Sequence, residues 1–368
     1  MNVEKRIRRI RDLLSERNLA GIIVSRYQTQ GYLTGVYQRW KTIMFVPRDG
    51  KPIVCSIERE RVQDEAWDCD LLEFTPTPFM SSLYYSKIET VVNEIKKVRL
   101  DGEKLGFEKA HMSISEFEQL KSLLPHAELI NAEDLIPSIM LIKDNEELKV
   151  LRKLAAIADA GLNEALKTLR AGVTELEVSG LMDLTMKRLG AEKMWFPTHV
   201  ASGYRSNFRM AYPSDKVIQY GDKVALDVGP MFQLYCGQLN TQVVVGKGSS
   251  EYKRLFDNSV TVLQGIFDSL EPGKKASDVY YSGERKAKET GYNEFFPLFF
   301  GRGIGIIENE ELLTLSPYCQ TMLKPGMVLA LVTYLRYGEY VISNERMVEI
   351  TEHGARWLSS FPLGFVEI

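Results

Sequence analysis

The stretch GDKVALDVGPMFQLYCGQLNTQVVVG, residues 221–246, contains the side chains best suited to chemistry. Its pattern predicts two strands joined by a tight connection, with Asp227 where the first strand ends. Because side chains alternate between the two faces of a strand, Cys236, Gln238 and Asn240 should point the same way. We expect Asp227 to point there too. The result would be a polar wall that offers a carboxylate as a base, a thiol as a nucleophile and two amides.

Two candidate groups also have a structural interpretation, and it is the commoner one. Cys236 would be a reactive thiolate only if a neighbouring cation, such as Arg302, lowered its pKa. Otherwise it is a small, inert, half-buried side chain. His199, in FPTHVASG, is the imidazole nearest to these strands, but a strand histidine is more often a satisfied core residue than a catalytic group.

The composition limits the classes of function. The 368 residues suffice for about two domains, and the net charge of −3 shows no basic footprint for nucleic acid or anionic membranes. No apolar run is long enough to span a membrane, and the charged N-terminal stretch predicts an amphipathic helix instead of a secretory signal. Four cysteines without a CxxC pair favour a reducing, cytoplasmic setting, and only four histidines argue against a zinc site of His and Cys.

Residues 1–140 alternate helical and strand patterns, which predicts an α/β domain. Its clearest elements are a first helix over about 4–18, a buried strand at 19–25, a hairpin of 42–47 with 51–57, and helices at 84–98 and 113–124. Residues 141–368 predict an α+β domain, because capped helices are followed by long strands. Capping boxes start helices at Asp144 and Thr174, and strands are expected over 327–335 and 339–350.

Several motifs occur in one order along nearly the whole chain. They are RNLAGIIVSRYQTQGYLTGVY, LIKDNEELKVLRKLAAIADAG, FPTHVASG, GDKVALDVGP, GRGIGI, LKPGMV and ERMVEITEHG. In this order they resemble the creatinase/prolidase family, whose pita-bread fold is shared with methionine aminopeptidase and aminopeptidase P. The resemblance implies an N-terminal domain over 1–140, a pita-bread domain over 141–368, and a homodimer.

A dinuclear peptidase site in that family takes two Asp, one His and two Glu. The resemblance places the first Asp at Asp227 and the second Glu at Glu345, whereas the other three positions fall on Gln238, Arg302 and Val332. A permanent guanidinium cation would repel a divalent ion. We therefore expect neither a metal nor another cofactor, and a cluster in which Arg302 neutralises the two remaining carboxylates.

Creatinase works without a metal and uses a histidine as its acid–base group. The matching position here is Met210, and a second family histidine falls on Asn309, before Glu310. The resemblance therefore leaves the acid–base group open. The catalytic candidates are Asp227, Glu345, Cys236 and His199; the candidates for substrate binding are Arg302, Gln238, Asn240, Arg205, Tyr235 and Glu310.

Three functions remain open at this point. The first is a metal-independent, creatinase-like enzyme that hydrolyses or eliminates at a C–N bond of a small, carboxylate-bearing molecule. The second is a catalytically inactive binding or scaffold protein on the same fold. The third is an Xaa-Pro metallopeptidase with atypical ligands. In each case the expected partners are a small molecule and a second copy of the chain, with no nucleic acid or membrane.

Overall fold

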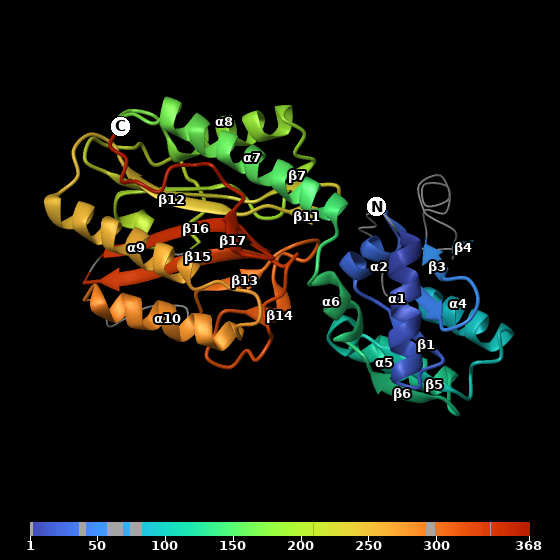
Figure 1. Cartoon of the computed structure of the whole chain (residues 1–368). Helices are drawn as coiled ribbons and strands as arrows, with labels where there is room; N and C mark the ends of the chain where they lie inside the picture. Colours follow the sequence, from blue (N-terminus) through green and yellow to red (C-terminus); the bar gives the residue numbers. More distant parts are fainter. Residues whose placement is uncertain are drawn as a thin grey trace. The chain divides into compact units, whose positions relative to one another are not determined.

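The computed structural model describes residues 3–36, 42–56, 69–73, 83–208, 210–291, 299–338 and 340–368. The chain divides into two compact units, Met1–Met140 and Leu141–Ile368, and Figure 1 labels most of their helices and strands.

The N-terminal unit is built on a six-stranded sheet in the order β4-β3-β2-β1-β5-β6. Strand β1 pairs antiparallel with β2 and parallel with β5, so the sheet is mixed. Every residue of β1 to β3 is buried, as expected for strands covered on both faces. The elements are α1 (Val3–Glu16), β1 (Gly21–Val24), α2 (Tyr27–Thr34), β2 (Ile43–Pro47), β3 (Ile53–Ser56), β4 (Asp70–Glu73), α4 (Leu83–Lys97), β5 (Lys104–Phe107), η1 (Lys109–His111), α5 (Ile114–Leu123), β6 (Glu128–Asn131) and α6 (Leu135–Met140).

Local sequence signals explain where these elements begin and end. The expected hairpin forms, because β2 and β3 pair antiparallel and Gly50 between them has a φ of +107°. Residue 57, which the sequence assigned to the second strand, lies outside the described residues. Ser113 and Glu116 form the capping box that starts α5. The predicted α/β class of this unit is confirmed.

The C-terminal unit is built on a sheet in the order β14-β13-β15-β16-β12-β9-β8, with β17 paired to β16. The predicted capping boxes at Asp144 and Thr174 start its first two helices. The elements are α7 (Asn145–Thr168), α8 (Glu175–Arg188), β7 (Lys193–Met194), β8 (His199–Ser202), η2 (Gly203–Asn207), β9 (Lys223–Val228), β10 (Pro230–Phe232), β11 (Tyr235–Cys236), β12 (Leu239–Val244), α9 (Ser250–Asp268), α10 (Ala276–Glu289), β13 (Gly301–Gly303), β14 (Glu310–Thr314), β15 (Val328–Tyr337), β16 (Tyr340–Thr351) and β17 (Gly354–Trp357).

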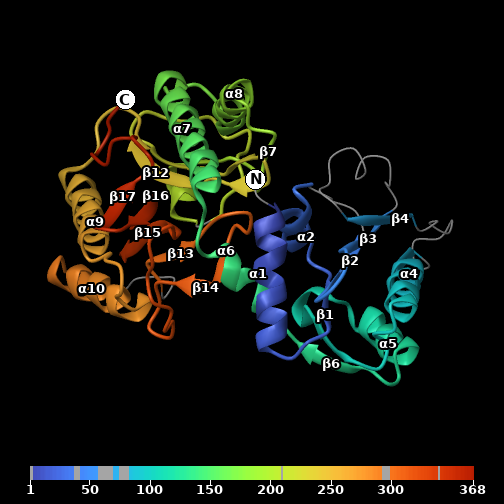
Figure 2. The ribbon, with the colours of Figure 1, turned by 45° about the vertical axis from the view of Figure 1, so that its right-hand side comes forward.

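Helices cover one face of this sheet and leave the other face for polar side chains. Leu226 and Val228 of β9 belong to the core formed with α7 and α8, whereas Asp227 between them does not. In the same way Leu329 and Leu331 of β15 pack with α9 and α10. Figure 2 shows α9 and α10 together beside β15 and β16, while α7 and α8 pack as a second pair against β8, β9 and β12. This arrangement is the predicted α+β pita-bread domain.

The 221–246 stretch is more than a simple hairpin. Strands β9 and β12 pair antiparallel, but the chain between them forms β10 and β11, which join β7 in a separate three-stranded sheet. The turn between β10 and β11 has positive φ at both Gln233 (47°) and Leu234 (75°). Glycine or asparagine usually fills such positions, and a leucine there costs about 1–2 kcal/mol.

Candidate functional site

The register of the large sheet aligns five residues in one row. His199 lies opposite Asp227, Asp227 opposite Asn240, Asn240 opposite Glu345, and Glu345 opposite Val332. Directly opposed residues of neighbouring strands project from the same face. The row therefore crosses β8, β9, β12, β16 and β15 on the face that the helices leave uncovered.

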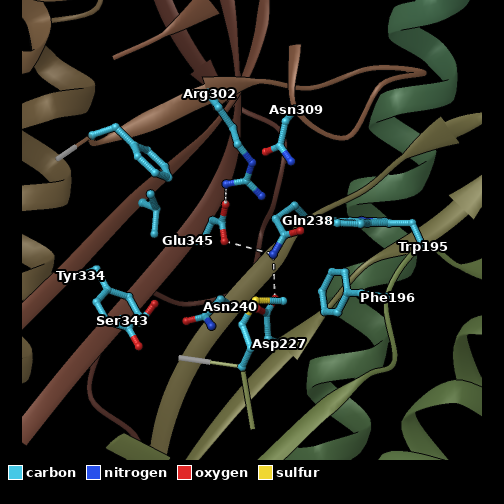
Figure 3. Close-up of a pocket in the computed structure, with 13 residues that line it drawn as sticks. Trp195, Phe196, Asp227, Gln238, Asn240, Arg302, Asn309, Tyr334, Ser343 and Glu345 are labelled. Atoms are coloured by element: carbon cyan, nitrogen blue, oxygen red, sulfur yellow. Dashed lines mark hydrogen bonds and ion pairs between the residues drawn. The ribbon is translucent and has the colours of Figure 1, made fainter. Parts of the chain in front are cut away.

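The middle of this row borders a pocket of about 180 Å³, which we name the site pocket. Asp227, Gln238, Asn240, Arg302 and Glu345 all line it. Figure 3 shows these side chains converging, with the amide of Gln238 between the carboxylates of Asp227 and Glu345. Five of the ten residues that the sequence proposed for the site thus meet in one pocket.

Hydrogen bonds connect four of these side chains. Gln238 Nε2 donates to Asp227 Oδ1 over 2.7 Å and to Glu345 Oε2 over 3.0 Å. Both hydrogens of this amide group are thereby used, while Gln238 Oε1 has no hydrogen-bond partner within the described part of the chain. Arg302 Nη1 donates to Glu345 Oε1 over 2.5 Å. The sequence predicted that Asp227, Arg302 and Glu345 would cluster, but it did not foresee that Gln238 links the two carboxylates.

The pair of Arg302 and Glu345 is largely removed from water, since their side chains are 13% and 6% exposed. In such surroundings a charged hydrogen bond is strong, and a charge left without a partner is costly. The charged side chains among the described lining residues are two carboxylates and one guanidinium. Asp227 is the more accessible of the two carboxylates.

The side chains of the pocket do not fit a dinuclear metal centre. Among the lining residues that the structure describes, only Asp227 and Glu345 supply anionic donors, and the guanidinium of Arg302 lies against Glu345. Within the described ranges, no group of three or more His, Cys, Asp or Glu side chains is arranged to hold a metal ion. A divalent ion normally needs several oxygen or imidazole ligands and is repelled by a fixed cation.

His199 lies at the end of the row, just outside the site pocket. It lines a small adjoining cavity of about 20 Å³, which we name the side cavity and which Asp227 and Asn240 also line. The imidazole contacts the rings of Phe196 and Tyr212, with centroids 5.0 and 5.6 Å away. Burial lowers the pKa of His199, which keeps the ring neutral at neutral pH.

The prediction that Cys236 faces the pocket is wrong. The backbone N–H of Gly237 donates to Pro230 O, and Cys236 belongs to the small sheet, so the strand alternation that would carry the thiol to the pocket is interrupted. The thiol points to Ile306 O at 3.9 Å, and burial raises its pKa well above the ordinary value. A buried, protonated thiol outside the pocket is not a nucleophile for a molecule bound inside it.

Tyr235 and Glu310, both proposed for substrate binding, instead make buried contacts at the start of α7. The hydroxyl of Tyr235 donates to Glu147 Oε1 over 2.7 Å. Glu310 pairs with Lys143 at 2.6 Å, with side chains only 3% and 1% exposed. Burial raises the pKa of Glu310, and the ammonium of Lys143 opposes this shift. These two contacts join β11 and β14 to the residues at the start of α7.

Arg205 is likewise engaged elsewhere. Its Nε lies 3.1 Å from Glu175 Oε2, and its Nη2 donates to Tyr212 O over 2.5 Å. Glu175 is fully buried and also accepts hydrogen bonds from Ser202 and Ser214. Arg205 therefore fixes the loop after β8 and is not placed to bind a substrate.

Several side chains of the pocket were not expected from the sequence. Trp195, Phe196, Tyr334 and Ser343 line it, with the aromatic pair of Trp195 and Phe196 on one side. Asn309, which the resemblance matched to a family histidine, also lines it. The signal for Ser343 was present, because it stands two residues before Glu345 on the same strand and must share its face. No local signal indicated Trp195.

Comparisons with known proteins identify the family of this chain. Residues 6–140 match the family model described as creatinase/prolidase N-terminal domain, and residues 149–352 match the model of metallopeptidase family M24. An Xaa-Pro dipeptidase of Pyrococcus furiosus is 30% identical over 73% of this chain and 76% of its own length. The chain belongs to the creatinase/prolidase family.

Other relatives of this creatinase/prolidase family member span all or nearly all of the chain. The putative dipeptidase YkvY of Bacillus subtilis is 25% identical over 97% of this chain and 98% of its own. A solved Xaa-Pro dipeptidase from Bacillus anthracis superposes with a TM-score of 0.89 over 100% of both chains, at 25% identity.

Of the helices in the described part of the chain, none is long and apolar enough to cross a membrane.

Proposed function

We propose that this chain is a hydrolase that cleaves a C–N bond of a small molecule bound in the site pocket, without a dinuclear metal centre. The relatives named as Xaa-Pro dipeptidases support the reaction class, since a peptide bond is such a C–N bond. The pocket volume of about 180 Å³ suits a small molecule of about dipeptide size. The observation that supports a metal-independent reaction is the chain of contacts from Asp227 through Gln238 and Glu345 to Arg302.

The roles in this proposal follow from the contacts. Asp227 is accessible from the pocket and is oriented by Gln238, so it can hold and polarise the attacking water. Arg302 uses Nη1 for Glu345, and its remaining N–H groups can stabilise negative charge that develops on the substrate carbonyl oxygen. Asn240 and Asn309 offer further polar contacts to the substrate. A carboxylate on the substrate would also have to bind Arg302, because Arg205 is held by Glu175.

A second candidate function is an Xaa-Pro metallopeptidase. The comparisons favour it over the metal-free enzyme, because the matching family model is described as a metallopeptidase family. A third candidate, a binding or scaffold protein without activity, also stays open. A homodimer, a cytoplasmic location and the absence of nucleic-acid partners remain predictions.

One assay separates the candidates. The purified wild-type protein is incubated with Xaa-Pro dipeptides and with small amides, each with Mn²⁺ or Co²⁺ added and each after chelation, with Asp227→Asn as a matched inactive control. The proposal expects turnover that chelation leaves unchanged and that Asp227→Asn reduces by about 10²–10⁴-fold. Turnover only with added metal would favour the metallopeptidase. Tight binding without turnover of any substrate would favour the binding protein.

A further inference from the structure

His199 is the one histidine of the described chain that lies in the row of site residues. Its backbone pairs directly with that of Asp227 across β8 and β9, so both side chains project from the uncovered face. The imidazole is 5% exposed, and its Nε2 atom has no hydrogen-bond partner among the described residues. A buried polar nitrogen without a partner costs free energy, which a bound molecule would recover.

A second buried polar atom without a partner belongs to another residue that lines the side cavity. Asn240 lies next to Asp227 in the row, is 9% exposed, and its Oδ1 accepts no hydrogen bond from any part of the chain described by the structure. His199, Asn240 and Asp227 all line the side cavity. Its volume of about 20 Å³ is close to the space that one water molecule requires, about 10–15 Å³.

The side cavity adjoins the site pocket. Asp227, Asn240, Tyr334 and Ser343 line both of them. A molecule in the side cavity therefore contacts the same carboxylate and amide as a substrate in the pocket. It would have two to four polar partners, which is the number that an ordered buried water normally has.

We propose that His199, Asn240 and Asp227 hold one water molecule where the two cavities meet, and that this water is the nucleophile of the reaction, with His199 as its base. This inference rests on the proposed hydrolase function. Asn240 Oδ1 accepts one hydrogen of the water, or Asp227 does so in its place. The other hydrogen points to His199 Nε2.

The proton balance of this step is complete without any further reactant. The water oxygen forms a bond to the substrate carbonyl carbon while its proton passes to Nε2, which gives an imidazolium beside the Asp227 carboxylate. The C–N bond then breaks, and the nitrogen leaves with the proton that the imidazolium returns. One water is consumed, and His199 ends as the neutral ring.

The rings around His199 suit this role. Phe196 and Tyr212 both contact the imidazole and restrict its orientation. Asp227 on the neighbouring strand lines the same cavity, and a carboxylate there favours an imidazolium once the proton has moved.

The test uses the full chain and the substrate found in the wild-type assay. His199→Gln keeps an amide that can hold the water but removes the basic nitrogen. We expect kcat to fall by about 10²–10⁴-fold while KM and the melting temperature stay unchanged. Imidazole added to His199→Ala should restore part of the rate. His126→Gln, an exposed histidine of the other unit, is the matched control and should behave as wild type.

A wild-type rate in His199→Gln overturns the role of this histidine while the proposed function stands, and so does a loss in His199→Ala that imidazole does not restore. Wild-type protein that hydrolyses nothing overturns the proposed function before any variant is made. A crystal structure of the wild-type protein tests the water site separately. It should show a water about 3 Å from His199 Nε2 and from either Asn240 Oδ1 or a carboxylate oxygen of Asp227, and an empty side cavity would contradict the proposal.

Discussion

Arg302 and Glu345 form an ion pair at 2.5 Å inside the site pocket, and both side chains are largely buried. The other carboxylate oxygen of Glu345 accepts a hydrogen bond from Gln238. Glu345 is therefore satisfied by the protein itself, without any bound cation. These contacts make the pocket a preformed polar site. Asp227 is the more accessible of its two carboxylates.

We predict that the purified protein holds no stoichiometric divalent metal. The guanidinium of Arg302 lies against Glu345, and a second cation at the same carboxylate would be repelled. Elemental analysis after dialysis should give far less than one ion per chain, and chelation should leave the melting temperature unchanged. About one or two ions retained per chain would show that the metallopeptidase interpretation is correct.

Arg302→Ala should lower the free energy of unfolding by about 3–5 kcal/mol, because it leaves the buried carboxylate of Glu345 without its cation. Adding Glu345→Gln to this variant should recover part of the loss. The matched control is Arg336→Ala, an exposed arginine on β15, which should change stability by less than about 0.5 kcal/mol. Urea denaturation measures all three variants. Equal stability of Arg302→Ala and wild type would mean that the pair is not desolvated in solution.

Substitution of Glu310 should change the stability of the protein and leave substrate binding unchanged. Glu310→Gln leaves the ammonium of Lys143 buried without an anion, so we expect a loss of about 3–5 kcal/mol in stability. Its carboxylate does not line the site pocket, so KM should stay at the wild-type value. Lys143→Met combined with Glu310→Leu removes both charges and should be more stable than Glu310→Gln alone. A raised KM with unchanged stability would show that Glu310 binds substrate after all.

Glu108 in the N-terminal unit should make stability depend on pH. This carboxyl is buried and accepts hydrogen bonds from the backbone N–H groups of Ser25 and Arg26 and from the hydroxyl of Thr29. Burial raises its pKa from 4.5 to about 7 in the folded state. Between these two values the folded chain binds a proton that the unfolded chain has lost, so stability falls as pH rises through this window.

The size of this effect is about 3 kcal/mol between pH 4.5 and 7, at 1.36 kcal/mol for each unit of pKa shift. Glu108→Gln cannot titrate, so the difference in unfolding free energy between wild type and this variant isolates the contribution of Glu108. Thermal melts of both proteins across the window measure that difference. A difference independent of pH would contradict the raised pKa.

The parts of the fold that depend on neighbouring residues in the chain were predictable from the sequence. The capping boxes at Asp144 and Thr174 are signals only four residues long, and both helices begin where these boxes predict. Strand alternation correctly placed Asp227, Gln238 and Asn240 along one pocket wall. These inferences need no knowledge of distant contacts.

Contacts between distant residues decided where the predictions were wrong. Arg205 is held by Glu175, thirty residues away, and Glu310 by Lys143, which is 167 residues away. The sequence around Arg205 or Glu310 contains no signal that predicts these partners. Strand register is likewise a property of the assembled sheet, so the alignment of His199 with Asp227 could not be read from one strand alone.

Three substitutions would give this pocket the metal-ligand set that the family resemblance implies. Gln238→Asp, Arg302→His and Val332→Glu, made together, would give the pocket two Asp, one His and two Glu. Val332 lies directly opposite Glu345 in the sheet, so a carboxylate at that position would share its face. We expect this triple variant to bind one or two Mn²⁺ or Co²⁺ ions per chain, measured by titration calorimetry.

The control is the double variant with Gln238→Asp and Val332→Glu, which keeps the guanidinium of Arg302. It gains the two carboxylates but should bind metal far more weakly, because the fixed cation still lies against Glu345. Equal binding by both variants would mean that Arg302 does not exclude the metal. A folded triple variant that binds no metal would mean that the strands of this pocket no longer hold the spacing that a dinuclear centre requires.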